Sequence, residues 1–367
     1  MDYTFIDSAD GVEYIPNQTQ WKPEQGIFNI KPYKVQFPRE KIALRSWTMW
    51  RYKEALPFHD QRCFNISLGE GGTPLLPLNA DDPNILVKLD YLMPTGSFKD
   101  RGAAVLISKA RELGVKEVLA DSSGNAGTAI AAYCARAGIK SYIYVPENTS
   151  ERKLAQMKAY GAEIHKIAGS REDTAIAAKR TVEEEQLFYA SHVYNPFFHE
   201  GTKTFAFEIW EQMNYQIPDQ LILPVGNGTL LLGAYIGFQN LLESGMIQRL
   251  PKLVGVQAEN CAPIAQAFHR KRDINPVSNT GTLAEGIAIA DPVRGSQIMK
   301  AVKTTGGSII TARENEIETA RGELSSKGFY VEPTTAATYA AFKNYKQANL
   351  SKEAKVVMSL CGSGLKK

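Results

Sequence analysis

The chain has 367 residues, of which 44% are hydrophobic and 22% charged, so it is long enough for two packed lobes or one large α/β domain. Lysine and arginine (42) nearly balance aspartate and glutamate (39), which makes nucleic acid and anionic membranes poor candidate partners. No apolar run reaches transmembrane length, the start "MDYTFIDSAD" is unlike a secretory signal, and the four cysteines and five histidines lack metal-ligand spacing. We therefore expect a cytoplasmic enzyme without a metal site.

The order of the predicted elements indicates the fold class. Residues 1–60 are rich in Pro and Trp and are expected to form an irregular arm packed on the larger lobe. Beyond the arm, short apolar runs alternate with helical patterns such as 125–138 and 150–161, which predicts a doubly wound, largely parallel α/β fold. The predicted strands are residues 84–90, 117–123, 141–147, 162–168, 220–226, 253–259 and 356–362.

Lys99 occupies a distinctive position in the stretch "YLMPTGSFKDRGAAVL" (91–106). It follows a Pro-Thr-Gly-Ser turn and precedes an amphipathic helical pattern, and such junctions often present catalytic side chains. A lysine that burial holds partly neutral attacks carbonyl groups and forms a Schiff base. The alternative is an ion pair with Asp100 or with a glutamate elsewhere, and the motif alone leaves both readings open.

Three glycine-rich loops each follow a predicted strand. They are "DSSGNAGTAIAAY" (121–133), "LPVGNGTLLLGAY" (223–235) and "SLCGSGLKK" (359–367). Glycine lets a ligand approach the backbone, and free N–H groups at a helix N-terminus bind anions. None of the loops has a P-loop lysine or the acidic residue of a dinucleotide site, and each alone could be a structural turn. Because loops at the carboxyl ends of parallel strands converge, the three loops and Lys99 together indicate pyridoxal 5′-phosphate.

The chain also resembles a known family in the order of its motifs. "EGGTPLL" (70–76), "PTGSFKDRGA" (94–103), "SSGNAGTAIAAY" (122–133), "PVGNGTLLLG" (224–233), "VEPTTAATYAAF" (331–342) and "CGSGLK" (361–366) follow the order seen in fold-type II pyridoxal-phosphate enzymes, which include the β-subunit of tryptophan synthase. "MWRYKEALP" (49–57) and "EGTKTFAFEI" (200–209) look most like threonine synthases.

The resemblance implies an architecture and an activity. The architecture would be two doubly wound, mostly parallel lobes with the cofactor in the cleft between them: a large lobe (61–103 and 206–367) and a small mobile lobe (104–205). The protein would be a homodimer that acts on a small amino acid. As a lyase of the threonine synthase type, it would eliminate phosphate or a similar leaving group, with or without addition of water.

The resemblance also implies roles for individual residues. Lys99 would bond to the cofactor and move protons at the substrate Cα, Phe98 would lie against the ring, and Asn125 would bind its O3′. Cys361 would face the pyridine nitrogen, where threonine synthases usually have threonine and some serine dehydratases have cysteine. An uncharged thiol would leave that nitrogen largely unprotonated. The phosphate would be bound by Gly226, Asn227, Gly228 and Thr229, and the substrate by Ser122, Ser123, Ala126, Gly127, Thr128 and Phe198.

Two of these positions depart from the threonine synthase pattern. Ala126 stands where the family has a threonine, and Phe198, in "NPFFHEG" (195–201), stands where it has an arginine. Both family residues hold the phosphate of O-phosphohomoserine. A second candidate function is therefore β-elimination or β-replacement on another amino acid, as in serine/threonine dehydratases, ammonia-lyases or cysteate synthase. A non-catalytic amino-acid-binding relative is the third, and the intact Lys99 argues against it.

Two remaining motifs are interpreted as structural. Residues 70–74 are expected to form a tight turn near the cofactor. A threonine hydroxyl of "EPTT" (332–335) is expected to cap the helix that follows it.

Overall fold

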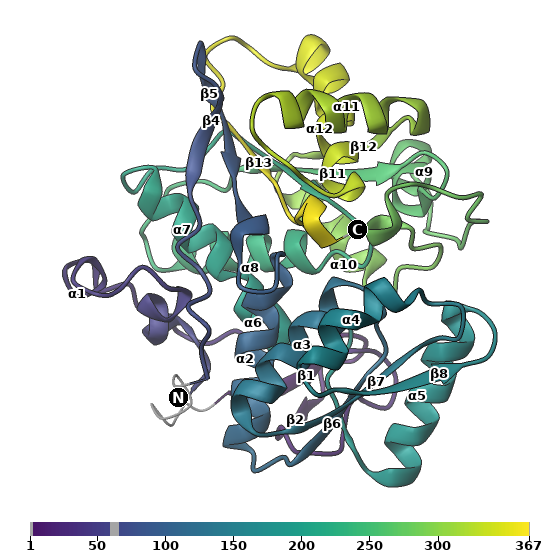
Figure 1. Cartoon of the computed structure of the whole chain (residues 1–367). Coiled ribbons are helices and arrows are strands. Elements are labelled where there is room, and N and C mark those ends of the chain that lie inside the picture. The colour runs from purple at the N-terminus through teal and green to yellow at the C-terminus, as the bar shows by residue number, and fades with distance from the viewer. Residues whose placement is uncertain (1–2, 59–65, 367) are drawn as a thin grey trace. The chain divides into compact units, whose positions relative to one another are not determined.

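The computed structural model describes residues 3–58 and 66–366, and its contacts divide the chain into two compact units (Figure 1). The first unit contains the chain up to Gly71 together with Lys99–Thr202, and the second contains Gly72–Phe98 and Lys203–Lys367. The polypeptide therefore crosses from one unit to the other three times, and one crossing is the Phe98–Lys99 peptide bond. Lys99 had been expected at the edge of the large lobe. It groups with the smaller sheet instead, because the whole helix that it begins packs there.

The sheet of the first unit has helices on both faces. Its four strands are all parallel in the order β8-β7-β6-β9. In β6, Val118 and Ala120 join a core cluster with helices α2, α3 and α4, whereas the intervening Leu119 joins a second cluster with Ala178 and Val182 of α5. Alternate side chains of a strand point to opposite faces, so this division is that of a doubly wound sheet. The elements are β6 (Glu117–Ala120), β7 (Lys140–Pro146), β8 (Glu163–Ile167), β9 (Phe188–Tyr189), α2 (Lys99–Glu112), α3 (Asn125–Ala137), α4 (Glu151–Ala159) and α5 (Arg171–Glu185).

The N-terminal segment belongs to this first unit. It forms a small antiparallel sheet, in which Phe5 and Phe28 join the α2–α3 core cluster, and the Phe5 ring lies 5.1 Å from that of Phe197. The segment therefore packs on the smaller sheet, which differs from the expected arm on the larger lobe. The composition of the segment showed that it has aromatic residues available for packing. It did not show which apolar face of the protein these residues would cover. Its elements, with the short helix that carries Phe197, are β1 (Phe5–Asp7), β2 (Glu13–Tyr14), β3 (Phe28–Ile30), α1 (Arg39–Ala43), the 3-10 helix Met49–Ala55 and α6 (Phe197–Thr202).

The second unit is built on a six-stranded sheet in the order β12-β11-β10-β13-β5-β4, in which only the edge strand β4 is antiparallel. Val254 and Val256 of β11 pack with α11 and α12, whereas Gly255 between them lies against Leu231 of α8 on the opposite face. The strands are β4 (Leu75–Asn79), β5 (Asp82–Lys88), β10 (Gln220–Pro224), β11 (Lys252–Ala258), β12 (Ser308–Ala312) and β13 (Val356–Ser359). The helices are α7 (Thr204–Gln212), α8 (Thr229–Glu243), α9 (Pro263–Arg270), α10 (Gly295–Thr304), α11 (Glu314–Ser326), α12 (Pro333–Asn349) and the 3-10 turns Asp90–Leu92, Glu285–Ile287 and Gly364–Lys366.

The predicted α/β fold class is confirmed, since all seven predicted strands and the helices predicted at 125–138 and 150–161 are present. In the described part of the chain, no helix combines the length and apolar character needed to cross a membrane.

Candidate active site

The Pro-Thr-Gly-Ser turn before Lys99 is fixed to the C-terminal glycine loop. The N–H of Phe98 donates to the carbonyl of Cys361 (3.0 Å), and the N–H of Ser363 donates to the carbonyl of Gly96 (2.9 Å). Ser97 also forms a β-bridge with Gly362. Two motifs separated by more than 250 residues are thus held together by backbone hydrogen bonds. The hydrogen-bonded segment ends at Phe98, the residue directly before Lys99.

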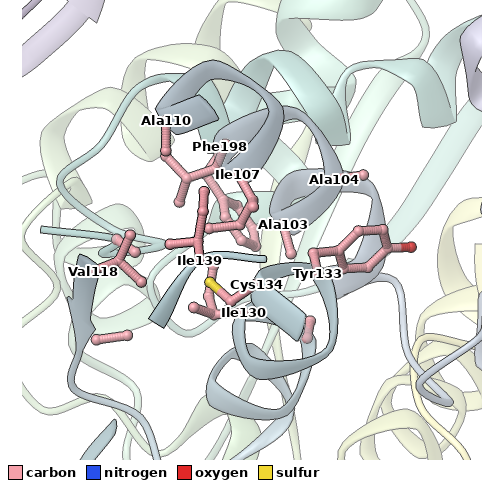
Figure 2. Close-up of a cluster of buried hydrophobic side chains, with 14 of the residues drawn as sticks. Ala103, Ala104, Ile107, Ala110, Val118, Ile130, Tyr133, Cys134, Ile139 and Phe198 are labelled. Atoms are coloured by element: carbon pink, nitrogen blue, oxygen red, sulfur yellow. The ribbon is translucent and has the colours of Figure 1, made fainter. Parts of the chain in front are cut away.

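Within its own unit, Lys99 is the half-buried first residue of α2 and lies beside an aromatic side chain. Its Nζ is 5.5 Å from the centroid of the Phe198 ring, which is completely buried. Phe198 belongs to the same buried cluster as Ala103 and Ile107 of this helix (Figure 2). The helix makes room for the ring at Gly102, where a Cβ would lie only 2.2 Å from it. Phe198, at the position where the resemblance described above predicts an arginine, is therefore a fixed apolar side chain close to the lysine.

His192 is a neighbour of this group that sequence reasoning missed. Its ring centroid lies 5.9 Å from that of Phe198, and the side chain is buried. Burial, followed by the positive charge of Lys99, holds the pKa of His192 well below its ordinary value. The imidazole is therefore neutral near pH 7. No motif surrounds this histidine, so only the folded neighbourhood reveals it.

The asparagine loop is a compact turn that opens α3. Asn125 is the first helical residue and is half-buried, as are Ser122 and Ser123, whereas Gly124 is exposed with open space beside its Cα. A Cβ on Gly127 would lie 1.9 Å from the carbonyl oxygen of Ser122, so glycine is required for the turn to close. Ala126, Gly127 and Thr128, which were expected to bind substrate, are buried in the first turn of the helix.

The loop of Gly226, Asn227, Gly228 and Thr229 connects β10 to α8. Gly228 has a φ of 76°, a left-handed conformation that glycine adopts without strain. A Cβ on Gly226 would lie 3.0 Å from the Cα of Ile287, so this glycine allows a close approach of two backbones. No acidic side chain lies in the first turn of α8, whose N–H groups are therefore suited to an anion.

Cys361 is enclosed by two side chains from the start of α12. Its Sγ lies 3.0 Å from the hydroxyl of Thr335 and 3.7 Å from a carboxylate oxygen of Glu332. Burial, with the charge of Glu332 as a second cause, raises the pKa of the thiol well above its ordinary value. Cys361 is thus a neutral thiol.

The expected cap of α12 is corrected by the same contacts. The N-cap residue is Glu332, and no side-chain hydrogen bond caps the helix. The hydroxyl of Thr335 instead accepts from the backbone N–H groups of Cys361 and Gly362, because the C-terminal loop passes directly beside it.

Glu70 anchors the "EGGT" turn in the first unit. Its carboxylate accepts hydrogen bonds from the indole of Trp50 and from the hydroxyl of Tyr133 (2.9 Å). Burial and the surrounding carboxylates raise the pKa of Tyr133 well above its ordinary value, so this phenol remains a donor. The turn continues into Gly71 and Gly72, both with positive φ.

Comparison with known proteins identifies the family. Residues 66–362 match the pyridoxal-phosphate dependent enzyme family. The chain belongs to this family. It is 37% identical to threonine synthase from Methanocaldococcus jannaschii over 93% of this chain and 86% of that protein, and 34% identical to threonine synthase from Methanosarcina acetivorans over 86% and 79%. The processed form of threonine deaminase isoform 2 from Solanum lycopersicum has the same fold, with a TM-score of 0.72, 20% identity and coverage of 95% of this chain and 92% of that one.

The groups described above fit the cofactor that defines the family. Lys99 supplies an amine, Asn125 an amide, the start of α8 unhindered N–H groups, and Cys361 a thiol. The hydroxyl of Ser97, buried two residues before Lys99, has no hydrogen-bond partner among the described residues, as expected beside a polar ligand. This pyridoxal-phosphate-dependent lyase is therefore similar in sequence to threonine synthases, and its residues carry chemical groups that suit the cofactor.

Proposed function

We propose that this enzyme acts as a lyase of the threonine synthase type, which removes a leaving group from an amino acid with or without addition of water. The observation that carries the proposal is the setting of Lys99. The lysine begins α2 directly after a turn bonded to the C-terminal glycine loop, and its amine lies beside the buried Phe198 ring. A lysine amine can both bond to an aldehyde and move a substrate proton.

The remaining site residues are proposed to orient the cofactor and the substrate. Asn125 donates to the ring oxygen and Phe98 lies against the ring. The loop of Gly226, Asn227, Gly228 and Thr229 holds the phosphate. When bound, pyridoxal phosphate supplies a conjugated ring that stabilises negative charge at the substrate Cα. His192 is neutral and buried. We therefore propose that Lys99, rather than His192, removes and returns the proton at the substrate Cα.

A second candidate concerns the substrate, and Phe198 favours it. A buried aromatic ring packed on Gly102 gives no charge-assisted hydrogen bond to a phosphate, and losing one such contact costs about 1.5–3 kcal/mol. We therefore propose, as the alternative, β-elimination or β-replacement on an amino acid with a smaller or less charged leaving group.

One assay separates the two candidates. Purified enzyme with pyridoxal phosphate is given O-phosphohomoserine, and release of phosphate and threonine is measured. Turnover at ordinary efficiency establishes the threonine synthase reaction. No turnover there, with ketoacid and ammonia released from serine, threonine or a substituted alanine, establishes the second candidate.

We also propose that the enzyme is a cytoplasmic homodimer without nucleic-acid or membrane partners. The near-neutral charge balance supports the last part, and the exposed Leu44 and Trp47 of the first unit offer apolar surface for a second copy. Light scattering during size-exclusion chromatography tests the dimer. A mass of one chain at micromolar concentration would contradict it.

A further inference from the structure

A buried tyrosine is hydrogen-bonded to the residue that precedes the asparagine loop (residues 122–125). The hydroxyl of Tyr189 in β9 donates to Oδ1 of Asp121 at 2.8 Å. The two side chains meet because β6 and β9 are parallel neighbours, in which Leu119 is paired with Tyr189. Asp121 lies two residues after Leu119, so its side chain is on the same face of the sheet as the tyrosine. The loop therefore begins at a residue that is bonded to the adjacent strand.

The phenol is the contact that fixes this carboxylate. Among the residues that the structure describes, Asp121 has no ion pair and no side-chain hydrogen bond other than the one from Tyr189, and the charges of Arg171 and Lys179 act on it only through space. Burial raises the pKa of Asp121, which the Tyr189 hydrogen bond opposes. Burial and the charge of Asp121 raise the pKa of Tyr189 well above its ordinary value, so the phenol keeps its proton. A half-buried carboxylate without a counter-ion depends on such a donor.

Trp21 of the N-terminal segment holds the Tyr189 ring in place. Its indole makes edge contacts with Tyr189 and Tyr194, at centroid distances of 5.3 and 5.1 Å and interplanar angles of 88°. The two tyrosine rings also lie beside each other, with centroids 6.1 Å apart. Lys179 of α5 donates to the Tyr194 hydroxyl at 3.0 Å, which fixes the third ring. Rings at these separations attract one another, so the orientation of the Tyr189 hydroxyl depends on the indole.

We propose that Tyr189 and Asp121 are positioning residues for the asparagine loop, and that Trp21 connects this loop to the N-terminal segment. The indole orients the phenol, the phenol holds the carboxylate, and the carboxylate fixes the start of the loop. The consequence for catalysis rests on the proposed function, in which the loop binds the substrate. Breaking these contacts should weaken substrate binding more than it slows proton transfer by Lys99, which belongs to another element.

Hydrogen exchange of the holoenzyme measures the loop directly. In Tyr189→Phe the amides of residues 121–128 should exchange about tenfold faster, because a hydrogen bond to a charged group contributes on that order to local stability. Asp121→Ala should have the same effect. Asp121→Asn keeps an oxygen that accepts from the phenol and should exchange at nearly the wild-type rate, and Trp21→Ala should give a smaller increase than Tyr189→Phe. Unchanged exchange in both Tyr189→Phe and Asp121→Ala overturns the proposal.

Tyr144→Phe is the matched control for loss of a buried hydroxyl. Tyr144 belongs to β7 of the same sheet, and its hydroxyl donates to Thr181 of α5 (3.3 Å) rather than to the loop. This variant should leave the exchange of residues 121–128 unchanged. If it accelerates that exchange as much as Tyr189→Phe does, the effect is a general loss of stability and the proposal is wrong.

Substrate binding gives the second readout. L-serine and O-phosphohomoserine are titrated into the holoenzyme, and the change in cofactor absorption gives a dissociation constant. For the amino acid that binds, Tyr189→Phe should raise this constant and KM about tenfold while kcat changes less, and Asp121→Asn should leave both near the wild-type values. Faster loop exchange with an unchanged dissociation constant overturns the consequence for catalysis. Failure of the proposed function would appear separately, as a wild-type enzyme that binds neither amino acid and carries no cofactor on Lys99.

Discussion

At the scale of single residues, the pair formed by Phe198 and Gly102 has the clearest energetic signature. Replacing a glycine inside a helix by alanine normally stabilises the helix by about 1 kcal/mol. At Gly102 the new Cβ would lie 2.2 Å from the Phe198 ring, and such overpacking costs about 1–3 kcal/mol. Gly102→Ala should therefore destabilise the protein in urea unfolding.

Two further variants make this prediction specific. The exposed Gly322 of α11 has no atom within 4 Å of its Cβ position, so Gly322→Ala should raise stability. Phe198→Leu should recover part of the loss in Gly102→Ala, with a coupling free energy of about 1 kcal/mol. If the changes in unfolding free energy caused by the two substitutions were additive, the Phe198 ring would not be in steric contact with the helix at residue 102.

His192 should make stability depend on pH. The pKa of His192 in the folded state lies below its unfolded value of 6.5. Below pH 6.5 the unfolded state therefore binds a proton at this histidine that the folded state does not bind. This contribution is fully present above pH 6.5 and is lost as the pH falls. The unfolding free energy should drop by about 1.4 kcal/mol per pH unit below that point. His192→Gln should flatten this slope, while His269→Gln, at an exposed site, should leave it unchanged. An equal slope in His192→Gln would refute the assignment.

The contacts of Cys361 also decide how its variants behave. Serine keeps a small polar group beside Thr335, so Cys361→Ser should be well tolerated. An aspartate there would place a second carboxylate within about 4 Å of Glu332, and like charges at that separation disfavour joint ionisation. Cys361→Asp should therefore lower the melting temperature, and Glu332→Gln should relieve the loss. An undisturbed melting temperature in Cys361→Asp would indicate that the carboxylate lies elsewhere.

At the scale of elements, a buried ion pair joins β5, α7 and the turn after Glu70. Lys88 and Glu208 are fully buried with 2.7 Å between Nζ and Oε2, and they also bind the Thr73 carbonyl and the Gly72 N–H. Removing one partner leaves an unpaired buried charge, which costs about 3–5 kcal/mol. Lys88→Met should therefore unfold at much lower denaturant concentration than the wild type.

The double variant Lys88→Met/Glu208→Leu should recover most of that loss, since apolar groups of similar volume replace the pair. Lys22→Met is the matched control, because Lys22 pairs with Glu183 at the exposed surface and should change stability little. If Lys88→Met behaves like Lys22→Met, the buried pair does not hold the turn.

The elements that could be predicted are those that lie deep in the sheets. The continuous apolar runs of β10 and β13, for example, are buried at every position. β4 was missed because it contains Pro77 and lies exposed at the sheet edge, where the proline needs no partner for its nitrogen. β9 has only two residues, too few for any periodicity.

At the scale of the whole molecule, local motifs identified the family but not the contacts between distant segments. Lys99 and the glycine loops carry their signal in a few adjacent residues. By contrast, the interactions of Phe198 with Gly102 and of Thr335 with Cys361 depend on how segments far apart in the chain pack. The N-terminal segment illustrates the same limit, since its aromatic residues fit either apolar surface until the fold determines which one they meet.

Cofactor removal should affect the stability of the whole molecule. A ligand that binds only the folded state stabilises it by about 2.7 kcal/mol at 100 times its dissociation constant. Protein stripped of pyridoxal phosphate should melt at lower temperature, and adding the cofactor should restore the original value. An Asn227→Ala variant should need more cofactor for the same recovery. Identical melting curves with and without cofactor would contradict the assigned phosphate loop.

The most direct test of the account is to locate the bond between cofactor and protein. Holoenzyme is reduced with borohydride and digested, and the peptides are analysed by mass spectrometry. We expect the pyridoxyl group on the peptide that contains Lys99. Lys99→Ala should be inactive and carry no covalent label, and Lys99→Arg should behave alike, because a guanidinium stays charged. Label on another lysine, or undiminished turnover in Lys99→Ala, would contradict the central claim.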